Sequence, residues 1–290
     1  MSERDSNIFA DWKLLHGIRQ QRPLIHCITN YVTANDTANI ILAMGASPVM
    51  AEARQEVEEI TALSKGLVLN IGTLNESRAE AMLLAGKKAA ALGHPVILDP
   101  VGAGASQFRT EAARQIIREV PCTVIRGNAS EIRSLAGMTA YPQGVDADMR
   151  DRVGDSDAEE MISHIRRLSK ETGAVIIMTG EIDMIVDQEE ACRLSNGHRM
   201  MAGITGTGCM MDGILAAFLA ADVPVQGAAT PLSSFWRAVY GVAAAGICGE
   251  LAGKRTIAAG GGSGSFRMHY IDMMSSLSDE DIKGGIKLEI

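Results

Sequence analysis

Residues 66–100 decide the fold, and they read GLVLNIGTLNESRAEAMLLAGKKAAALGHPVILDP. Two short apolar runs, Gly66–Ile71 and Pro95–Asp99, enclose a segment of helical periodicity at Ser77–Ala91. The runs are nearly continuous in apolar residues, which is typical of strands covered on both faces of a parallel sheet. A strand, a helix and a second strand in this order predict a crossover unit with two parallel strands.

The same alternation extends along most of the chain. We expect further strands at 24–28, 48–50, 123–126, 174–179 and 184–186, and further helices at 34–44, 57–63, 111–119, 129–136 and 158–171. Residues 190–201 look like a short antiparallel excursion, after which the chain turns helical to about residue 253. Residues 140–157 read as an exposed loop with at most one short helix, and 260–262 as a flexible glycine loop.

No repeat or linker divides the chain. The sequence therefore predicts one α/β domain over residues 1–290, with a mostly parallel central sheet and helices on both faces. The terminal segments 1–20 and 267–290 are the least diagnostic parts.

Composition excludes several classes of function. The chain is 47% hydrophobic and 21% charged, which is typical of a soluble globular protein. Its net charge of −8 and the lack of a Lys/Arg cluster argue against nucleic acid as a partner. The most apolar stretch, Ile204–Ala221, contains glycines, threonines and Asp212, so no membrane span is expected. The start of the chain lacks the pattern of a signal peptide, and we expect a cytoplasmic protein.

The cysteines are odd in number and scattered: Cys27, Cys122, Cys192, Cys209 and Cys248. This arrangement argues against a disulfide framework and against a zinc site. Cys122 and Cys192 lie in strand-like surroundings and are expected in the core.

The segment Thr205-Gly206-Thr207-Gly208-Cys209 opens an apolar helix that runs to about Ala221. Glycines allow close approach of a ligand, and the free N–H groups of a helix start attract anions. A phosphate cradle with the Cys209 side chain at its rim is one interpretation. A tight turn before a packed helix is the other.

Polar residues end several of the predicted strands. Asp99, Arg126 and Thr179 each stand at a strand end, and Asn70 precedes Ile71 and Gly72 at another. In open α/β sheets, ligands bind outside the carboxyl ends of the strands. Core packing gives no reason for these residues to gather at one edge, so we expect a site there.

Five blocks in this order resemble hydroxyethylthiazole kinases of the ribokinase-like superfamily: HCITN (26–30), NIGTL (70–74), DPVGAG (99–104), RGNASE (126–131) and TGTGC (205–209). The resemblance extends from about Ile25 to Phe266. It implies a ribokinase-like fold and ATP-dependent phosphorylation of the hydroxyl of 5-(2-hydroxyethyl)-4-methylthiazole, in thiamine salvage. It also implies Mg²⁺ and a homotrimer with sites at the subunit interfaces.

Two carboxylates are candidate metal-binding residues. Asp99 precedes Pro100 at a strand end, where a carboxylate can hold Mg²⁺ or simply cap its own turn. Glu131 follows Asn128 by three residues, which is the spacing of a helix capping box. The resemblance implies that Glu131 also positions the magnesium ion of ATP.

The resemblance assigns the ATP contacts to Arg126 and Thr179. Arg126 would supply a fixed positive charge to the phosphates, although a surface salt bridge is the alternative. For Thr179, the sequence by itself indicates only a polar strand cap.

The thiazole alcohol is assigned by resemblance to Asn30, Met50 and Gly206. Asn30 can hydrogen-bond a polar ligand, and the thioether of Met50 suits a flat ring, although Met50 alone reads as core. His26 has no adjacent acidic partner and is expected to be a structural hydrogen-bonding residue.

Cys209 is the candidate catalytic residue. Many ribokinase-like kinases carry an Asp at this position as the general base, whereas hydroxyethylthiazole kinases resemble this chain in carrying a Cys. Phosphoryl transfer needs mainly positioning and charge neutralisation, so we expect the thiol to orient the hydroxyl and form no phosphocysteine.

Two other functions remain open on the same residues. One is an ATP-dependent dehydratase that repairs hydrated nicotinamide cofactors, against which Cys209 argues because those enzymes carry Asp in this turn. The other is a non-catalytic nucleotide or thiazole binder, against which Asp99, Arg126 and Glu131 argue together.

Overall fold

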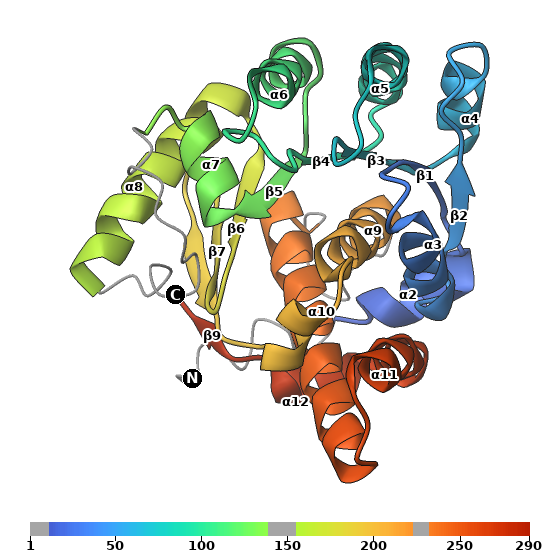
Figure 1. The fold of residues 1–290 in the computed structure, drawn as a ribbon, viewed down its shortest axis with the longest axis vertical. Helices are drawn as coiled ribbons and strands as arrows, with labels where there is room; N and C mark the ends of the chain where they lie inside the picture. The colour runs from blue at the N-terminus through green and yellow to red at the C-terminus, as the bar shows by residue number, and fades with distance from the viewer. Residues whose placement is uncertain (1–11, 139–154, 223–231) are drawn as a thin grey trace.

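The computed structural model describes residues 12–138, 155–222 and 232–290. Their centre is a nine-stranded sheet in the order β2-β1-β3-β4-β5-β6-β7-β8-β9 (Figure 1). The first six strands of this order are parallel: β2 (Ser47–Met50), β1 (Leu24–Ile28), β3 (Gly66–Asn70), β4 (Val96–Asp99), β5 (Val124–Asn128) and β6 (Val175–Thr179). The last three join antiparallel: β7 (Asp183–Val186), β8 (Ala191–Leu194) and β9 (Leu288–Glu289).

Helices cover both faces of the sheet (Figure 1). One face carries α4 (Val57–Leu63), α5 (Glu76–Ala91), α6 (Gln107–Glu119), α7 (Ala129–Leu135) and α8 (Asp155–Thr172). The other carries α2 (Leu14–Gln21), α3 (Ala34–Ala43), α9 (Thr207–Ala220), α10 (Ser234–Ala258), α11 (Ser263–Ser276) and α12 (Asp279–Gly285). None of the helices among the described residues combines the length and apolarity needed to cross a membrane.

Alternating side chains of the strands divide the interior into two cores. In β4, Ile97 packs on the α9 face, whereas Val96 and Leu98 pack on the α5 face. Both faces are apolar because both are covered, which explains why the strands read as continuous apolar runs. The alternation predicted from residues 66–100 is confirmed.

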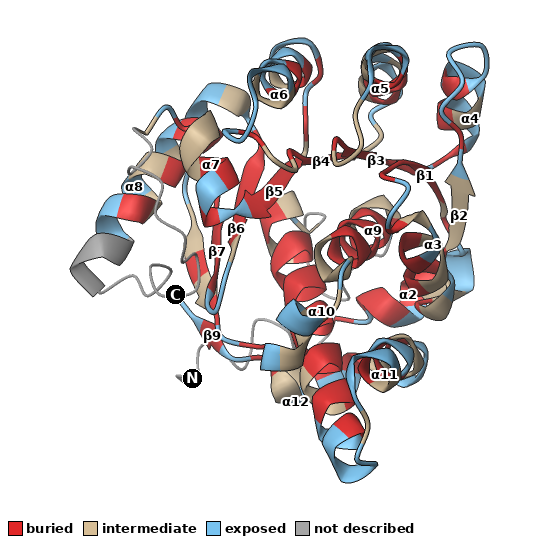
Figure 2. Cartoon of the chain, viewed as in Figure 1, coloured by how far each residue is buried: buried red, intermediate tan, exposed pale blue. Residues whose placement is uncertain are grey.

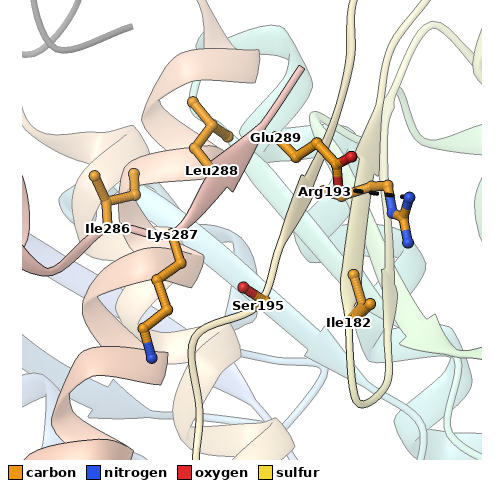
Figure 3. A pocket seen from close by; sticks show the side chains of 7 residues that line it. All are labelled: Ile182, Arg193, Ser195, Ile286, Lys287, Leu288 and Glu289. Atoms are coloured by element: carbon orange, nitrogen blue, oxygen red, sulfur yellow. Dashed lines mark ion pairs between the residues drawn. The ribbon is translucent and has the colours of Figure 1, made fainter. Parts of the chain in front are cut away.

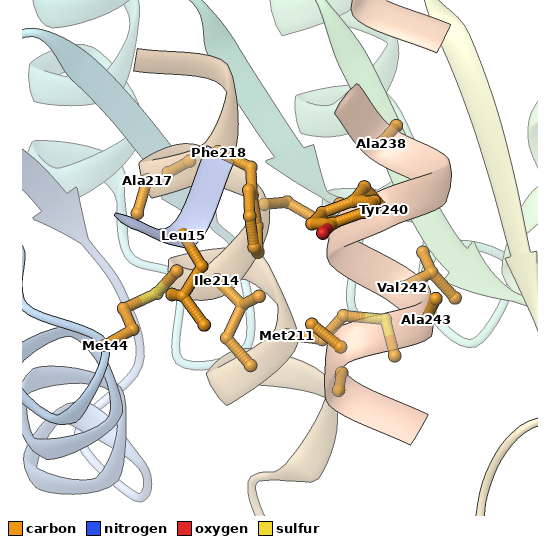
Figure 4. Packing of buried hydrophobic residues seen from close by; sticks show 14 of the residues in the cluster. Leu15, Met44, Met211, Ile214, Ala217, Phe218, Ala238, Tyr240, Val242 and Ala243 are labelled. Atoms are coloured by element: carbon orange, nitrogen blue, oxygen red, sulfur yellow. The ribbon is translucent and has the colours of Figure 1, made fainter. Parts of the chain in front are cut away.

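Helices α9 and α10 form the centre of the larger core, and most of both is buried, although the C-terminal end of α10 is exposed (Figure 2). Met211, Ile214 and Phe218 of α9 pack against α10 (Figure 4). Phe218 meets Tyr240 edge-on, with ring centroids 5.5 Å apart, a geometry that the ring quadrupoles favour. This packing fixes the start of α9 relative to the sheet.

Two connections were expected to be loops, at 260–262 and at 140–157. The glycines at 260–262 form a tight helix end: Gly260 has φ +63°, and the Gly261 N–H donates to Thr256 O at 2.9 Å. The expected loop is present as the short connection between α10 and α11, where a left-handed glycine closes the orphan carbonyls of α10, and its flexibility stays a prediction. Of the expected loop at 140–157, residues 140–154 lie outside the described residues, and α8 begins at Asp155.

The strand order reverses direction at β1, which lies between β2 and β3. The connections that leave β1 and β3 at their carboxyl ends therefore run apart and open a crevice. Polar residues at these strand ends are placed to line that crevice.

Candidate functional site

A pocket of about 330 Å³ lies at the carboxyl ends of the parallel strands. Its walls come from the segments that follow β1, β3, β4 and β5, and from the turn that begins α9. The lining residues include Asn30, Thr33, Thr73, Asp99, Arg126, Glu131, Gly206, Gly208 and Cys209. The convergence expected from the strand ends is thus observed for Asp99 and Arg126.

A buried charge cluster forms the floor of the pocket. The Arg126 guanidinium donates from Nη2 to Asp99 Oδ2 at 2.8 Å and from Nε to Asp212 Oδ1 at 2.9 Å. The Asp99 and Arg126 side chains are 1% and 7% exposed, and Asp212 is fully buried. Arg126 was expected as a fixed positive charge or a surface salt bridge, and it is a buried charge anchored between two buried carboxylates.

Burial and neighbouring charge shift the pKa values of this cluster. Burial raises the pKa of Asp99 well above its usual value, and Asp212 adds to the rise while Arg126 opposes it. For Arg126, burial alone would lower the pKa, but Asp212 and Asp99 more than compensate and raise it. Arg126 therefore stays charged, and Asp99 has a strong tendency to hold a proton or to meet a cation.

One carboxylate oxygen of Asp99 is available to hold a proton or to bind a cation. Asp99 Oδ2 accepts hydrogen bonds from Arg126 and from Asn70 Nδ2. Asp99 Oδ1 is buried and has no hydrogen-bond partner within the described residues. A buried carboxylate oxygen without a donor is costly, and a cation bound in the pocket would satisfy it.

Two asparagines hold the thiol of Cys209. Asn30 Nδ2 lies 3.2 Å from Cys209 Sγ, and Asn70 Nδ2 lies 3.4 Å from the same sulfur. Asn30 also accepts hydrogen bonds from the Thr33 N–H and hydroxyl through Oδ1. Cys209 is thereby fixed at the rim of the pocket, in the first turn of α9.

The Cys209 thiol is neutral near pH 7. Burial raises its pKa to about 11, and the nearby Asp212 and Asp99 contribute to the rise. These effects outweigh the helix N-terminus, which would lower it. A neutral thiol is a weak base and a poor nucleophile, so the site favours hydrogen bonding over proton removal.

Glu131 caps its helix and also reaches the pocket. Asn128 and Glu131 form the capping box that the spacing predicts, with Glu131 Oε2 accepting from the Asn128 N–H at 2.8 Å. Glu131 Oε1 accepts from the Gly102 N–H at 2.8 Å. Each oxygen keeps a lone pair, so capping leaves room for a further contact in the pocket.

The glycines before and within the first turn of α9 are required by their surroundings. Gly206 has φ +96°, in the left-handed region, and a Cβ there would lie 2.9 Å from Thr33 Cγ2. A Cβ on Gly208 would lie 2.6 Å from Arg126 Nη2. The backbone of this turn therefore packs directly on the Arg126 guanidinium, beside the free N–H groups of the helix start.

Two expected site residues lie outside this pocket. Thr179 ends β6, and its hydroxyl donates to Gly127 O at 3.3 Å. Met50 ends the edge strand β2 and is 39% exposed. Neither residue belongs to the pocket lining, whereas Asn30, Asp99, Arg126, Glu131, Gly206 and Cys209 do.

His26 and the core cysteines have the structural roles expected of them. His26 is fully buried, with Nδ1 2.9 Å from Thr61 Oγ1 and Nε2 2.8 Å from Ala51 O. Cys122 and Cys192 are buried.

Sequence reasoning missed Asp212 as a part of the site. Asp212 follows Cys209 by three residues, which places both on one face of α9, and it is an acid inside an apolar helix. That spacing, together with the cost of burying an unpaired carboxylate, was the available signal.

A second pocket lies at the far edge of the sheet, beside the paired strands β8 and β9 (Figure 3). Its lining includes Ile182, Ser195 and Lys287, and Arg193 pairs there with Glu289 at 3.5 Å. None of the strand-end candidates contributes to it.

Comparisons with known proteins agree with this arrangement. The chain matches the Hydroxyethylthiazole kinase family over residues 15–280. It is 48% identical over 275 residues to a hydroxyethylthiazole kinase of Clostridium acetobutylicum, covering 95% of this chain and 97% of that protein.

Solved structures agree as well. The structure of the hydroxyethylthiazole kinase from Pyrococcus horikoshii is similar with a TM-score of 0.77 at 33% identity, covering 95% of this chain and 96% of that one. A ribokinase-like superfamily protein from Enterococcus faecalis has a TM-score of 0.59 at 13% identity, covering 88% and 87%. The ribokinase-like fold is confirmed.

Proposed function

The chain belongs to the hydroxyethylthiazole kinase family, and we propose that it transfers the γ-phosphoryl group of ATP to the hydroxyl of 5-(2-hydroxyethyl)-4-methylthiazole. The bond between the γ-phosphorus and its bridging oxygen breaks, and a bond to the alcohol oxygen forms. ADP and the thiazole phosphate are the products, and the hydroxyl proton is released. The reaction belongs to thiamine salvage.

One observation carries the assignment of the site. Arg126, the glycine turn at the start of α9 and the Cys209 thiol all line one pocket at the switch of the sheet. An anchored guanidinium and free helix N–H groups both bind phosphate oxygens. Phosphoryl transfer depends mainly on such positioning and on charge neutralisation.

In this proposal Mg²⁺ is held by Asp99 and Glu131, which both line the pocket. The fit rests on Asp99 Oδ1, which is buried without a donor in the described part of the chain. When bound, Mg²⁺ would neutralise charge on the β- and γ-phosphates. Asp99 Oδ2 meanwhile keeps Arg126 and Asn70 in place.

Cys209 would orient the alcohol. With its pKa raised to about 11 by burial, the thiol stays protonated at neutral pH. Asn30 and Asn70 hold the sulfur, and the thiol lies beside the glycine turn that receives the transferred group. A hydrogen bond between thiol and hydroxyl suffices to aim the attacking oxygen, because the transition state needs little proton removal.

We further propose that the protein is a cytoplasmic homotrimer whose sites are completed at subunit interfaces. Met50 supports this proposal, because it is exposed on the edge strand β2 and lies outside the pocket of the single chain. Exposed apolar side chains that include Tyr31 and Val32 lie close to the rim of the site. In the trimer, Met50 of one subunit would contact the thiazole ring of the alcohol that is bound in the pocket of its neighbour. Thr179 remains a proposed ATP contact beside β5.

A coupled ADP-release assay separates the proposed function from its rivals. Purified protein is given Mg-ATP with the thiazole alcohol, with hydrated nicotinamide cofactor, or with neither. The proposal expects ADP release only with the alcohol. Release only with the hydrated cofactor would favour the dehydratase, and release with no addition or none at all would contradict the kinase assignment.

A further inference from the structure

Asp212 is placed to act on the reaction without touching the ligands. It is fully buried on α9 and is not part of the pocket lining. Its Oδ1 accepts from Arg126 Nε at 2.9 Å, and its Oδ2 lies 3.4 Å from Asn70 Nδ2. Arg126 lines the pocket and Asn70 contacts the Cys209 thiol, so both partners of Asp212 reach the site although Asp212 itself does not line it.

The carboxylates of Asp212 and Asp99 both bind the same edge of the Arg126 guanidinium. Asp212 accepts the hydrogen bond from Nε, and Asp99 accepts the one from Nη2. Nη1 has no hydrogen-bond partner within the described residues, and Arg126 lines the pocket. A guanidinium carries five N–H donors in one plane, so two anchors on one edge fix the plane and leave the Nη1 end for a ligand.

We propose that Asp212 is a positioning residue that holds Arg126 in the orientation in which its Nη1 end meets the phosphates of ATP. This inference rests on the proposed function, because it takes ATP as the ligand of Arg126. With Asp99 alone, the guanidinium could rotate about its single hydrogen bond at Nη2. The second hydrogen bond, from Nε to Asp212, prevents that rotation. The contact also ties α9, which carries the phosphate turn, to β5, which carries Arg126.

A double-mutant cycle tests the inference. Asp212→Ala, Arg126→Met and the double variant are compared for the Kd of Mg-ATP by calorimetry without alcohol, and for kcat and KM by ADP release. We expect Asp212→Ala to raise the Kd and the KM for ATP at least tenfold, with a change below threefold in the KM for the alcohol. In the Arg126→Met background, Asp212→Ala should change the Kd less than twofold.

Two further variants separate positioning from stability. Asp212→Asn keeps an oxygen acceptor for Arg126 Nε, and we expect it to recover most of the ATP affinity that Asp212→Ala loses. Ile214→Val also changes a buried side chain of α9, but it should lower the thermal midpoint without moving the KM for ATP. Circular dichroism confirms that each variant is folded.

Three results would overturn the inference: an unchanged Kd in Asp212→Ala, additive effects in the double variant, or equal losses in Asp212→Asn and Asp212→Ala. The proposed function fails differently. If the wild-type protein binds Mg-ATP but does not phosphorylate the alcohol, the kinase assignment is wrong, and the binding cycle still decides the role of Asp212. If it does not bind Mg-ATP, both are wrong.

Discussion

At the scale of single residues, the site is built around one arginine whose contacts the sequence only partly foretold. The strand-end position of Arg126 was predicted, because the direction of each strand can be read from the order of strands and helices, whereas its role as a phosphate ligand stays a prediction. Its anchoring by Asp212 could not be read in this way, since 86 residues separate the two partners. Only the packing of α9 on β3 and β4 brings them together.

Arg126→Lys should weaken the use of ATP even though it keeps the charge. The guanidinium binds Asp99 and Asp212 with one edge and still presents donors to phosphate at the other. The ammonium group of lysine is a single point charge and cannot do both. Losing a charge-assisted hydrogen bond costs about 1.5–3 kcal/mol, which corresponds to roughly a tenfold to hundredfold rise in the KM for ATP. Initial rates against ATP concentration measure the effect, and a KM and kcat equal to those of the wild type would remove Arg126 from the site.

Substitutions at Cys209 distinguish an orienting thiol from a nucleophile. Cys209→Ser should keep substantial activity because a hydroxyl still forms hydrogen bonds, whereas Cys209→Ala should lose rate and retain ATP binding. Cys209→Asp should also be active, since a carboxylate accepts a proton more readily than a neutral thiol.

A covalent mechanism predicts the opposite pattern for Cys209. All three variants would then be inactive, and the wild-type protein would gain the mass of one phosphoryl group during turnover. Intact-protein mass spectrometry during steady-state turnover decides between the two.

At the scale of elements, the start of α9 must approach the arginine closely. Gly208→Ala would place a Cβ 2.6 Å from Arg126 Nη2, so the guanidinium has to move. We expect a clear loss of kcat/KM for ATP with a small change in the thermal midpoint. Gly264→Ala is the matched control, because a Cβ there meets nothing within 4 Å. Equal activity in both variants would contradict the described contact.

The turn between β6 and β7 should make stability depend on pH. Burial raises the pKa of Asp183 to about 7, although the Gly180 N–H and Arg126 oppose the rise. The folded state therefore binds one more proton than the unfolded state between about pH 4 and pH 7. The free energy of unfolding contributed by this group falls as the pH rises through that window, and the loss is complete above pH 7.

Asp183→Asn removes this titration and keeps an acceptor for the Gly180 N–H, which lies 3.0 Å from Oδ1. The variant should be more stable than the wild type at pH 8, by roughly 2–4 kcal/mol, and about equal to it at pH 4. Thermal midpoints across this range measure the difference. A constant gap between the two proteins at every pH would show that Asp183 does not titrate in the window.

At the scale of the whole molecule, the strand and helix order was predictable because covered parallel strands and amphipathic helices have distinct periodicities. The polar strand ends, with Asp99 and Arg126 at one edge, followed from it, whereas the assignment of Asn30 and Glu131 to the site came from the resemblance. What could not be predicted depends on contacts across the fold, such as Asp212 with Arg126. The loop at 260–262 could be predicted from composition, whereas its role in ending α10 depends on the left-handed conformation of Gly260. Met50 ends the edge strand β2 and is exposed, outside the pocket, so its predicted contact with the thiazole ring stays a prediction.

In the proposed reaction, this pocket moves a phosphoryl group from ATP to the thiazole alcohol. Phosphorus NMR of a reaction with wild-type protein, Mg-ATP and the alcohol tests it most directly, because it observes the group that moves. We predict a new phosphomonoester signal that grows in step with ADP. ADP accompanied only by inorganic phosphate, or an unchanged ATP spectrum, would show that the protein does not phosphorylate the alcohol.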